Sequence, residues 1–163
     1  MYSFLFLLFI AVYSVSAEST INWNAAIEYA QRNPLEIRGI ENCGRDNDVF
    51  ELQDVIINPD PPKVGSSLNI TVVGNLKSVI DQGSYVKVRV RYGLITVVNT
   101  KIDLCKEISD YPELPQCPVQ PGRIAISEVT DMPDAPKGFY RADISGFTAS
   151  NAQIFCVVYK FKL

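Results

Sequence analysis

The chain has 163 residues, a formal net charge of −3 and a hydrophobic content of 47%. The slight acidic excess argues against a nucleic-acid-binding protein, because such proteins usually carry a basic face. The absence of histidine removes the usual general base, the histidine-activated nucleophiles and histidine-built metal sites. Carboxylates are present, but acidic residues in the turns of a β protein are usually solvated. We therefore expect neither catalysis nor a metal or other cofactor.

The first 17 residues have the features of a secretory signal peptide. An apolar run from Phe4 to Val12 precedes Val15-Ser16-Ala17, where a signal peptidase would find the small residues it requires. The run is much shorter than the roughly 20 residues of a membrane-spanning helix, although a buried strand or an anchoring helix is the alternative. We expect removal of residues 1–17 and a soluble protein in the secretory pathway, either in the vacuole or lysosome lumen or outside the cell.

Four cysteines lie in the part of the chain that would remain after this cleavage: Cys43, Cys105, Cys117 and Cys156. On the secretory route they predict two disulfides, with three connectivities left open by the spacing alone. Because no C-x-x-C pair is present, the spacing does not favour zinc.

Residues 18–38 differ in composition from the rest of the chain. They contain a short, weakly amphipathic run that Pro34 ends, without the β-branched residues of a sheet. We interpret residues 18–38 as a propeptide or flexible N-terminal segment, and residues 39–163 as one domain.

The clearest pattern in that domain is the alternation in Ser84–Val98. Val86, Val88 and Val90 point to one side and charged residues to the other, as in a strand with one buried face. Gly93 interrupts the run, which indicates a bend, a bulge or a hairpin corner.

Further short strands are predicted on both sides of this pair, and no helix is expected in the core. Phe50–Ile57 reads as a strand with a bulge at Asp54. Residues 67–74 alternate, with Asn69, Thr71 and Val73 outward, so the glycosylation sequon at Asn69 should face solvent. Residues 101–121 are expected to form a loop. The other predicted strands lie at 123–129, 139–144 and 152–163, where Lys160 and Lys162 face outward. About seven strands separated by turns are typical of an all-β, immunoglobulin-like two-sheet sandwich.

Several local strings then resemble one family. In chain order they are Cys43-Gly44, Pro59-Asp60-Pro61-Pro62-Lys63 with Gly65, Asn69-Ile70-Thr71, Gly83-Ser84-Tyr85-Val86-Lys87-Val88, Tyr92-Gly93, Asp103-Leu104-Cys105, Cys117-Pro118, Pro136-Lys137-Gly138-Phe139-Tyr140 and Cys156. Their order and spacing resemble the ML (lipid-recognition) domain, and most of all its fungal branch of phosphatidylglycerol/phosphatidylinositol transfer proteins, relatives of the Niemann-Pick type C sterol binder.

The resemblance implies a sandwich that holds lipid hydrocarbon between its sheets and carries it between membranes. It also implies that Cys43 pairs with Cys156 and Cys105 with Cys117. The third disulfide of the animal sterol binders is absent, because residues 58–63 contain no cysteine. Phosphatidylglycerol and phosphatidylinositol are therefore the first expected cargo, and transient membrane contact by a monomer is expected with them.

Two other functions remain open at this stage, a sterol carrier and a secreted recognition or adhesion sandwich without a lipid cavity. For the carrier, we expect the mouth beside Val97, Met132, Ala135 and Phe139, and an anionic head group near Lys63, Lys101, Arg123 or Lys137. The residues predicted to line the lipid cavity are Leu68, Ile70, Val72, Val86, Val88, Val90, Val97, Ile124, Ile126, Met132, Phe139, Tyr140, Val157, Tyr159 and Phe161.

Overall fold

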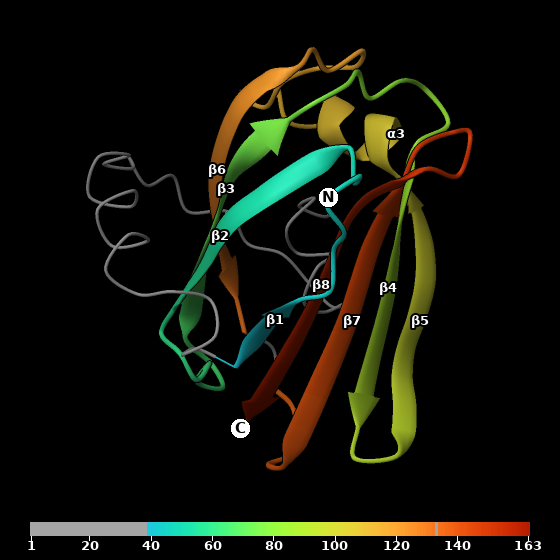
Figure 1. Ribbon diagram of the computed structural model, residues 1–163. Coiled ribbons are helices and arrows are strands. Elements are labelled where there is room, and N and C mark those ends of the chain that lie inside the picture. The colour runs from blue at the N-terminus through green and yellow to red at the C-terminus, as the bar shows by residue number, and fades with distance from the viewer. Residues whose placement is uncertain (1–38, 133) are drawn as a thin grey trace.

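The computed structural model describes residues 39–132 and 134–163. The predicted signal peptide and the segment 18–38 lie outside these residues. Within the described residues, eight strands form two antiparallel sheets that face each other, with one short helix at one end (Figure 1). The predicted all-β sandwich is confirmed, and the strand beyond the expected seven is the three-residue β1. No helix in the described part of the chain has the length and apolar character of a membrane span.

The larger sheet has the strand order β1-β8-β7-β4-β5 and the smaller one β2-β3-β6. The strands of the larger sheet are β1 (Ile40–Asn42), β8 (Gln153–Lys162), β7 (Phe139–Phe147), β4 (Tyr85–Tyr92) and β5 (Ile95–Asp103). Those of the smaller sheet are β2 (Phe50–Asn58), β3 (Ser67–Leu76) and β6 (Gly122–Asp131).

The alternation in β4 is confirmed. Val86, Val88 and Val90 are buried between the sheets, whereas Lys87 is exposed on the outer face. Gly93 is the hairpin corner between β4 and β5, and its φ of +55° lies in the left-handed region that glycine adopts without a steric penalty. The expected bulge in β2 is also present, as a register shift between Leu52 and Asp54.

The prediction that Thr71 and Val73 in β3 face solvent is wrong, because they are 5% and 3% exposed. Ile56, in register with Thr71 in the edge strand β2, is buried as well, so the outer face of this sheet is buried at both strands. The sequon residue Asn69 is half-buried, and its Oδ1 accepts a hydrogen bond from the Ser127 hydroxyl at 2.8 Å. Glycosylation of Asn69 stays a prediction.

The segment 101–121 is not simply the loop that we expected. It contains the end of β5 and the helix α3 (Leu104–Ser109). Asp103 caps the helix, since its side chain accepts a hydrogen bond from the Lys106 backbone N–H at 2.9 Å. Gln116 Nε2 lies within hydrogen-bonding distance of three backbone carbonyls at the helix end and the following turn, the nearest being that of Tyr111 at 2.8 Å.

Two disulfides are present, with the pairing that the family resemblance implied. Cys43–Cys156 joins the segment after β1 to β8 across 113 positions, and Cys105–Cys117 joins α3 to the link that follows it. Two disulfides and no free cysteine among the described residues are consistent with a chain that passes through the oxidising secretory pathway.

Candidate functional site

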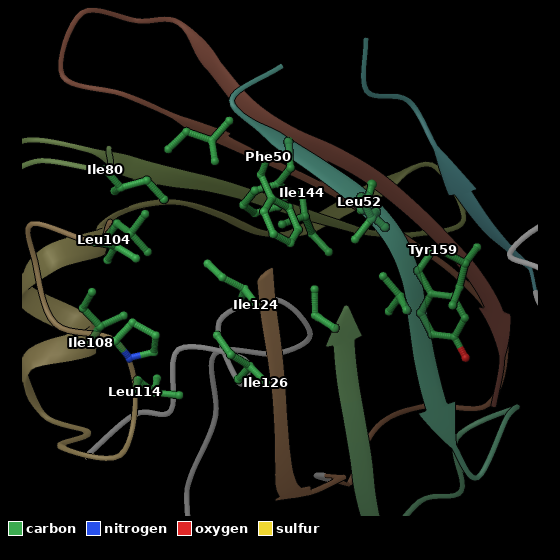
Figure 2. Close-up of a pocket in the computed structure, with 18 of the residues that line it drawn as sticks. Phe50, Leu52, Ile80, Leu104, Ile108, Leu114, Ile124, Ile126, Ile144 and Tyr159 are labelled. Atoms are coloured by element: carbon green, nitrogen blue, oxygen red, sulfur yellow. The ribbon is translucent and has the colours of Figure 1, made fainter. Parts of the chain in front are cut away.

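An apolar cavity of about 110 Å³ lies between the two sheets (Figure 2). Nineteen residues line it, and every one is aliphatic or aromatic apart from Pro115. The smaller sheet contributes Phe50, Leu52, Val55, Ile57, Val72, Ile124 and Ile126. The larger sheet contributes Ile40, Ile144, Ile154, Phe155, Val157 and Tyr159. The rest of the wall comes from α3 and the connections beside it: Ile80, Leu104, Ile108, Leu114, Pro115 and Val119.

The α3 end of the cavity is built from local sequence features. Leu104 and Ile108 are four residues apart, so both lie on the same face of the helix, and both are buried toward the cavity. Ile80 and Val119 are joined by a pair of backbone hydrogen bonds of 3.0 and 2.9 Å, which hold the link after α3 against the β3–β4 connection. Burial first, and then the nearby charge of Asp110, raises the pKa of Glu107 on this helix.

The opposite end of the cavity is formed by Tyr159, which is 0% exposed. In Figure 2 this ring lies far from Ile108 and Leu114, with its hydroxyl turned away from them. The hydroxyl donates a hydrogen bond of 2.6 Å to Asp60 Oδ1. Burial and this bond raise the pKa of the Tyr159 hydroxyl far above its ordinary value, so it stays neutral. The sole hydroxyl in the wall is therefore engaged with a carboxylate.

Pro115, in the link after α3, is the exposed residue of the wall. Other wall residues such as Ile144 are fully buried, and six are half-buried: Leu52, Val72, Leu114, Ile124, Ile126 and Phe155. The cavity is thus closest to solvent at Pro115.

A polar depression adjoins the cavity and shares three wall residues with it, Phe50, Leu52 and Phe155. Its polar lining includes two cations, Arg45 and Lys77. The carboxylates in the same lining are Asp46, Asp48 and Glu51. Asp48 is 4% exposed, and its Oδ2 accepts hydrogen bonds from the Arg45 backbone N–H and from Gln153 Nε2, both at 2.9 Å.

The structure brings five of the fifteen predicted cavity residues to the wall: Val72, Ile124, Ile126, Val157 and Tyr159. Seven others are buried in the surrounding core without lining the cavity: Leu68, Ile70, Val86, Val88, Val90, Met132 and Phe161. Tyr140 packs against that core, while Val97 and Phe139 are 53% and 69% exposed. None of the four residues expected at the mouth, and none of the four cations expected beside it, lines the cavity or the polar depression.

Sequence reasoning missed the α3 end of the wall entirely. The available signals were the capping aspartate Asp103 and the apolar pair Leu104 and Ile108 at helical spacing. It also assigned the buried side of β4 to the cavity, because alternation shows which side of a strand is buried but not where along the sandwich the sheets separate.

Comparison with known proteins agrees with this architecture. Residues 39–163 match the family model described as the ML domain. A phosphatidylglycerol/phosphatidylinositol transfer protein of Neurospora crassa is 32% identical over 148 residues, which cover 90% of this chain and 82% of that protein.

Two solved structures share the fold. The crystal structure of a Niemann-Pick type C2 protein from Japanese carpenter ant has a TM-score of 0.54 at 19% identity, over 76% of this chain and 97% of that one. Chicken MD-1 complexed with lipid IVa has a TM-score of 0.52 at 16% identity, over 76% and 96%. With the family model covering all of the described residues, the chain belongs to the ML domain family.

Proposed function

We propose that this protein is a lipid carrier that holds hydrocarbon chains between its two sheets and transfers phosphatidylglycerol and phosphatidylinositol between membranes. The observation that carries the proposal is the uniformly apolar cavity wall, whose one hydroxyl is already bonded to Asp60. The printed name of the Neurospora crassa relative supports the same activity and cargo.

Such a wall suits hydrocarbon for a simple energetic reason. A lipid in water exposes its chains at a cost of about 0.8 kcal/mol per CH2, or about 13 kcal/mol for a sixteen-carbon chain. An apolar wall offsets this cost for the part of the chain that it covers, so a cavity enlarged to take the whole chain would let the lipid leave a membrane without the chain meeting water. This activity involves no covalent step, and it is carriage rather than catalysis.

The polar depression offers hydrogen-bonding groups to a phospholipid head group, but carboxylates outnumber cations in its lining by three to two, so the proposed preference for phospholipid over sterol rests on the name of the Neurospora crassa relative. The depression begins where the apolar wall ends, at Phe50, Leu52 and Phe155. A phosphodiester placed there would meet the cations Arg45 and Lys77, and the hydroxyls of a glycerol or inositol head group would meet neighbouring carboxylates. A sterol, with one hydroxyl, would leave this depression unused. The carrier would work as a monomer in the vacuole or lysosome lumen or in the extracellular medium.

The test combines lipid identification with transfer. Native mass spectrometry of the secreted protein, followed by extraction, should find phospholipid at about one molecule per chain. The protein should also move fluorescent phosphatidylglycerol between vesicles. Protein that carries no lipid and moves neither phospholipid nor sterol would overturn the proposal, and sterol alone would overturn the proposed cargo.

A matched pair of variants ties the activity to the cavity. Ile126→Trp places a large ring into the cavity from β6, whereas Val129→Trp adds the same ring on the other face of the same strand. We expect Ile126→Trp to lose bound lipid and transfer, and Val129→Trp to keep both, with thermal unfolding as the check that each variant is folded. Normal transfer by folded Ile126→Trp would show that lipid binds elsewhere.

A further inference from the structure

Four large apolar side chains are exposed together at one corner of the larger sheet, which we call the apolar corner. Leu94 and Ile95, at the β4–β5 turn, are 100% and 65% exposed, and Val97 and Phe139 are 53% and 69% exposed. The Gly93 backbone N–H donates a hydrogen bond of 3.0 Å to the Phe139 carbonyl, so the turn and the start of β7 adjoin. Figure 1 shows these ends of β4, β5 and β7 at the end of the sandwich opposite α3. Exposed apolar groups gathered in this way mark an interaction surface.

The outer face of the same sheet is basic, although the whole chain is acidic. Strand register places seven of the chain's fifteen cationic residues on it: Lys87, Arg89, Arg91, Lys101, Arg141, Lys160 and Lys162. Three carboxylates share the face. Asp143 pairs with Arg91 and Arg141, Glu41 pairs with Lys160, and Asp103 caps α3. The face therefore keeps an excess of positive charge.

One of these cations lies directly at the apolar corner. Lys162 is in register with Phe139, and its Nζ lies 5.2 Å from the centre of that ring. Arg89, further along β4, donates a hydrogen bond to the Thr96 hydroxyl in β5 at 3.3 Å. The methylene groups of a lysine that lies over an aromatic ring can sit in an apolar interface with neighbouring aliphatic side chains. Its ammonium group can at the same time reach an anion.

The α3 end of the sandwich has the opposite character. The contiguous stretch 104–113 carries one lysine, Lys106, against three acidic residues: Glu107, Asp110 and Glu113. An anionic surface would be repelled from this end and attracted to the basic face and the apolar corner. Charge complementarity thus selects both the orientation and the kind of partner.

A column of aromatic rings connects the apolar corner with the cavity. Tyr92 lies 5.1 Å from Tyr140, Tyr140 lies 5.3 Å from Phe161, and Phe161 lies 4.8 Å from Tyr159, all measured between ring centres. Tyr92 is in register with Ile95 at the corner, and Tyr159 lines the cavity. A surface docked at the corner would therefore be joined to the end of the lipid site by continuous apolar packing.

From these features we infer that the apolar corner and the basic outer face of the β1-β8-β7-β4-β5 sheet form a docking surface for an anionic lipid bilayer. The four apolar side chains enter the interfacial region, while the cations face the anionic head groups. This inference rests on the proposed function, because a carrier must contact the membrane from which it takes its lipid. Docking can nevertheless be measured independently of lipid transfer.

The test is co-sedimentation of the secreted protein with vesicles of phosphatidylcholine alone or mixed with phosphatidylglycerol. We expect binding to the anionic vesicles that weakens with added salt, and little binding to the neutral ones. Leu94 is fully exposed, so its replacement should leave the fold intact. Leu94→Ser should lower binding by about tenfold, and Leu94→Trp should raise it because tryptophan favours the membrane interface.

Charge variants give the second arm of the test. Arg89→Gln and Lys162→Gln should each lower binding to anionic vesicles by about fivefold. The matched control is Lys106→Gln, which removes an exposed lysine from α3 and should leave binding unchanged. Equal binding of all these variants to anionic vesicles would overturn the inference. Equal binding of the unmodified protein to neutral and anionic vesicles would also overturn it. So would a dimer in solution that Leu94→Ser dissociates.

Lipid occupancy separates this inference from the proposed function. Leu94→Ser should retain the bound lipid of the unmodified protein in native mass spectrometry while it loses vesicle binding. Protein without bound lipid that still binds anionic vesicles would refute the proposed cargo but not the docking surface. Protein with bound lipid whose vesicle binding is insensitive to Leu94 and Lys162 would refute the docking surface alone.

Discussion

Replacement of Tyr159 by phenylalanine tests how the end of the cavity is held. The ring is buried, lines the cavity and stacks on Phe161, so Tyr159→Phe leaves the packing in place and removes only the hydroxyl. What is lost is the 2.6 Å hydrogen bond to Asp60. Hydrogen bonds to charged groups contribute about 1.5–3 kcal/mol to stability. Because Asp60 is otherwise exposed and can be rehydrated, we expect a loss near the lower limit, about 1.5 kcal/mol.

The assay is urea unfolding at neutral pH. For both proteins it measures the urea concentration at the midpoint and the slope of the unfolding free energy against urea concentration. The slope should be unchanged, since the surface exposed on unfolding is the same. The matched control is Tyr140→Phe, whose hydroxyl donates a 2.8 Å hydrogen bond to the Pro136 carbonyl at an exposed site. We expect the control to lose about 0.5 kcal/mol or less.

Equal losses in the two variants would refute the reasoning, because the difference in burial and in the charge of the acceptor would then have no effect. A loss above about 3 kcal/mol for Tyr159→Phe would also contradict it. In that case, removal of the hydroxyl would have disturbed the ring packing at the cavity end as well.

Three further changes have expected outcomes. The double variant Cys105→Ser with Cys117→Ser should lower the free energy of unfolding by about 3 kcal/mol in urea titrations, from the entropy of a short closed loop; an unchanged midpoint would contradict this. Burial raises the pKa of Asp143, but hydrogen bonds from its two arginine partners lower it further, so the net pKa is below its ordinary value. The stabilisation of the fold by ionised Asp143 is therefore present at neutral pH and is lost as the pH falls below about 4. Asp143→Asn should unfold at a lower temperature than the unmodified protein at neutral pH, and at the same temperature in acid. Gly74→Ala would place a methyl group against the Phe50 ring and the Glu51 backbone carbonyl oxygen, and it should cost about 1–3 kcal/mol in thermal unfolding; an unchanged unfolding temperature would contradict this.

The fold could be predicted because the apolar residues of several strands follow a period of two. In β4 the three valines are buried and Lys87 and Arg89 between them are exposed, as this period requires. The pattern failed at Thr71 and Val73 in β3, whose side chains are buried although alternation places them outside. A single strand's pattern contains no information on how well its neighbours cover its second face.

The cavity could be predicted only in part, for a geometric reason. The inward side chains of β6 and β8 line it, but those of β4 fill the core, although all have the same pattern. What separates them is the local distance between the sheets, which depends on the whole sandwich. Helix α3 was missed because six residues are too few for a periodic signal, and its stability comes from the Asp103 cap, the Cys105–Cys117 bridge and tertiary packing.

The size of the cavity shows that its wall must rearrange to admit a long acyl chain. An engineered cavity of about 150 Å³ holds one benzene ring, so the 110 Å³ found between these sheets is too small for a long acyl chain. The two sheets approach each other where β2 faces β8, whereas α3 occupies the wide end between β6 and β5 (Figure 1). The paired strands of each sheet are held together by their ladder hydrogen bonds. We therefore expect the added volume to come from movement of side chains and links in the wall rather than from separation of paired strands.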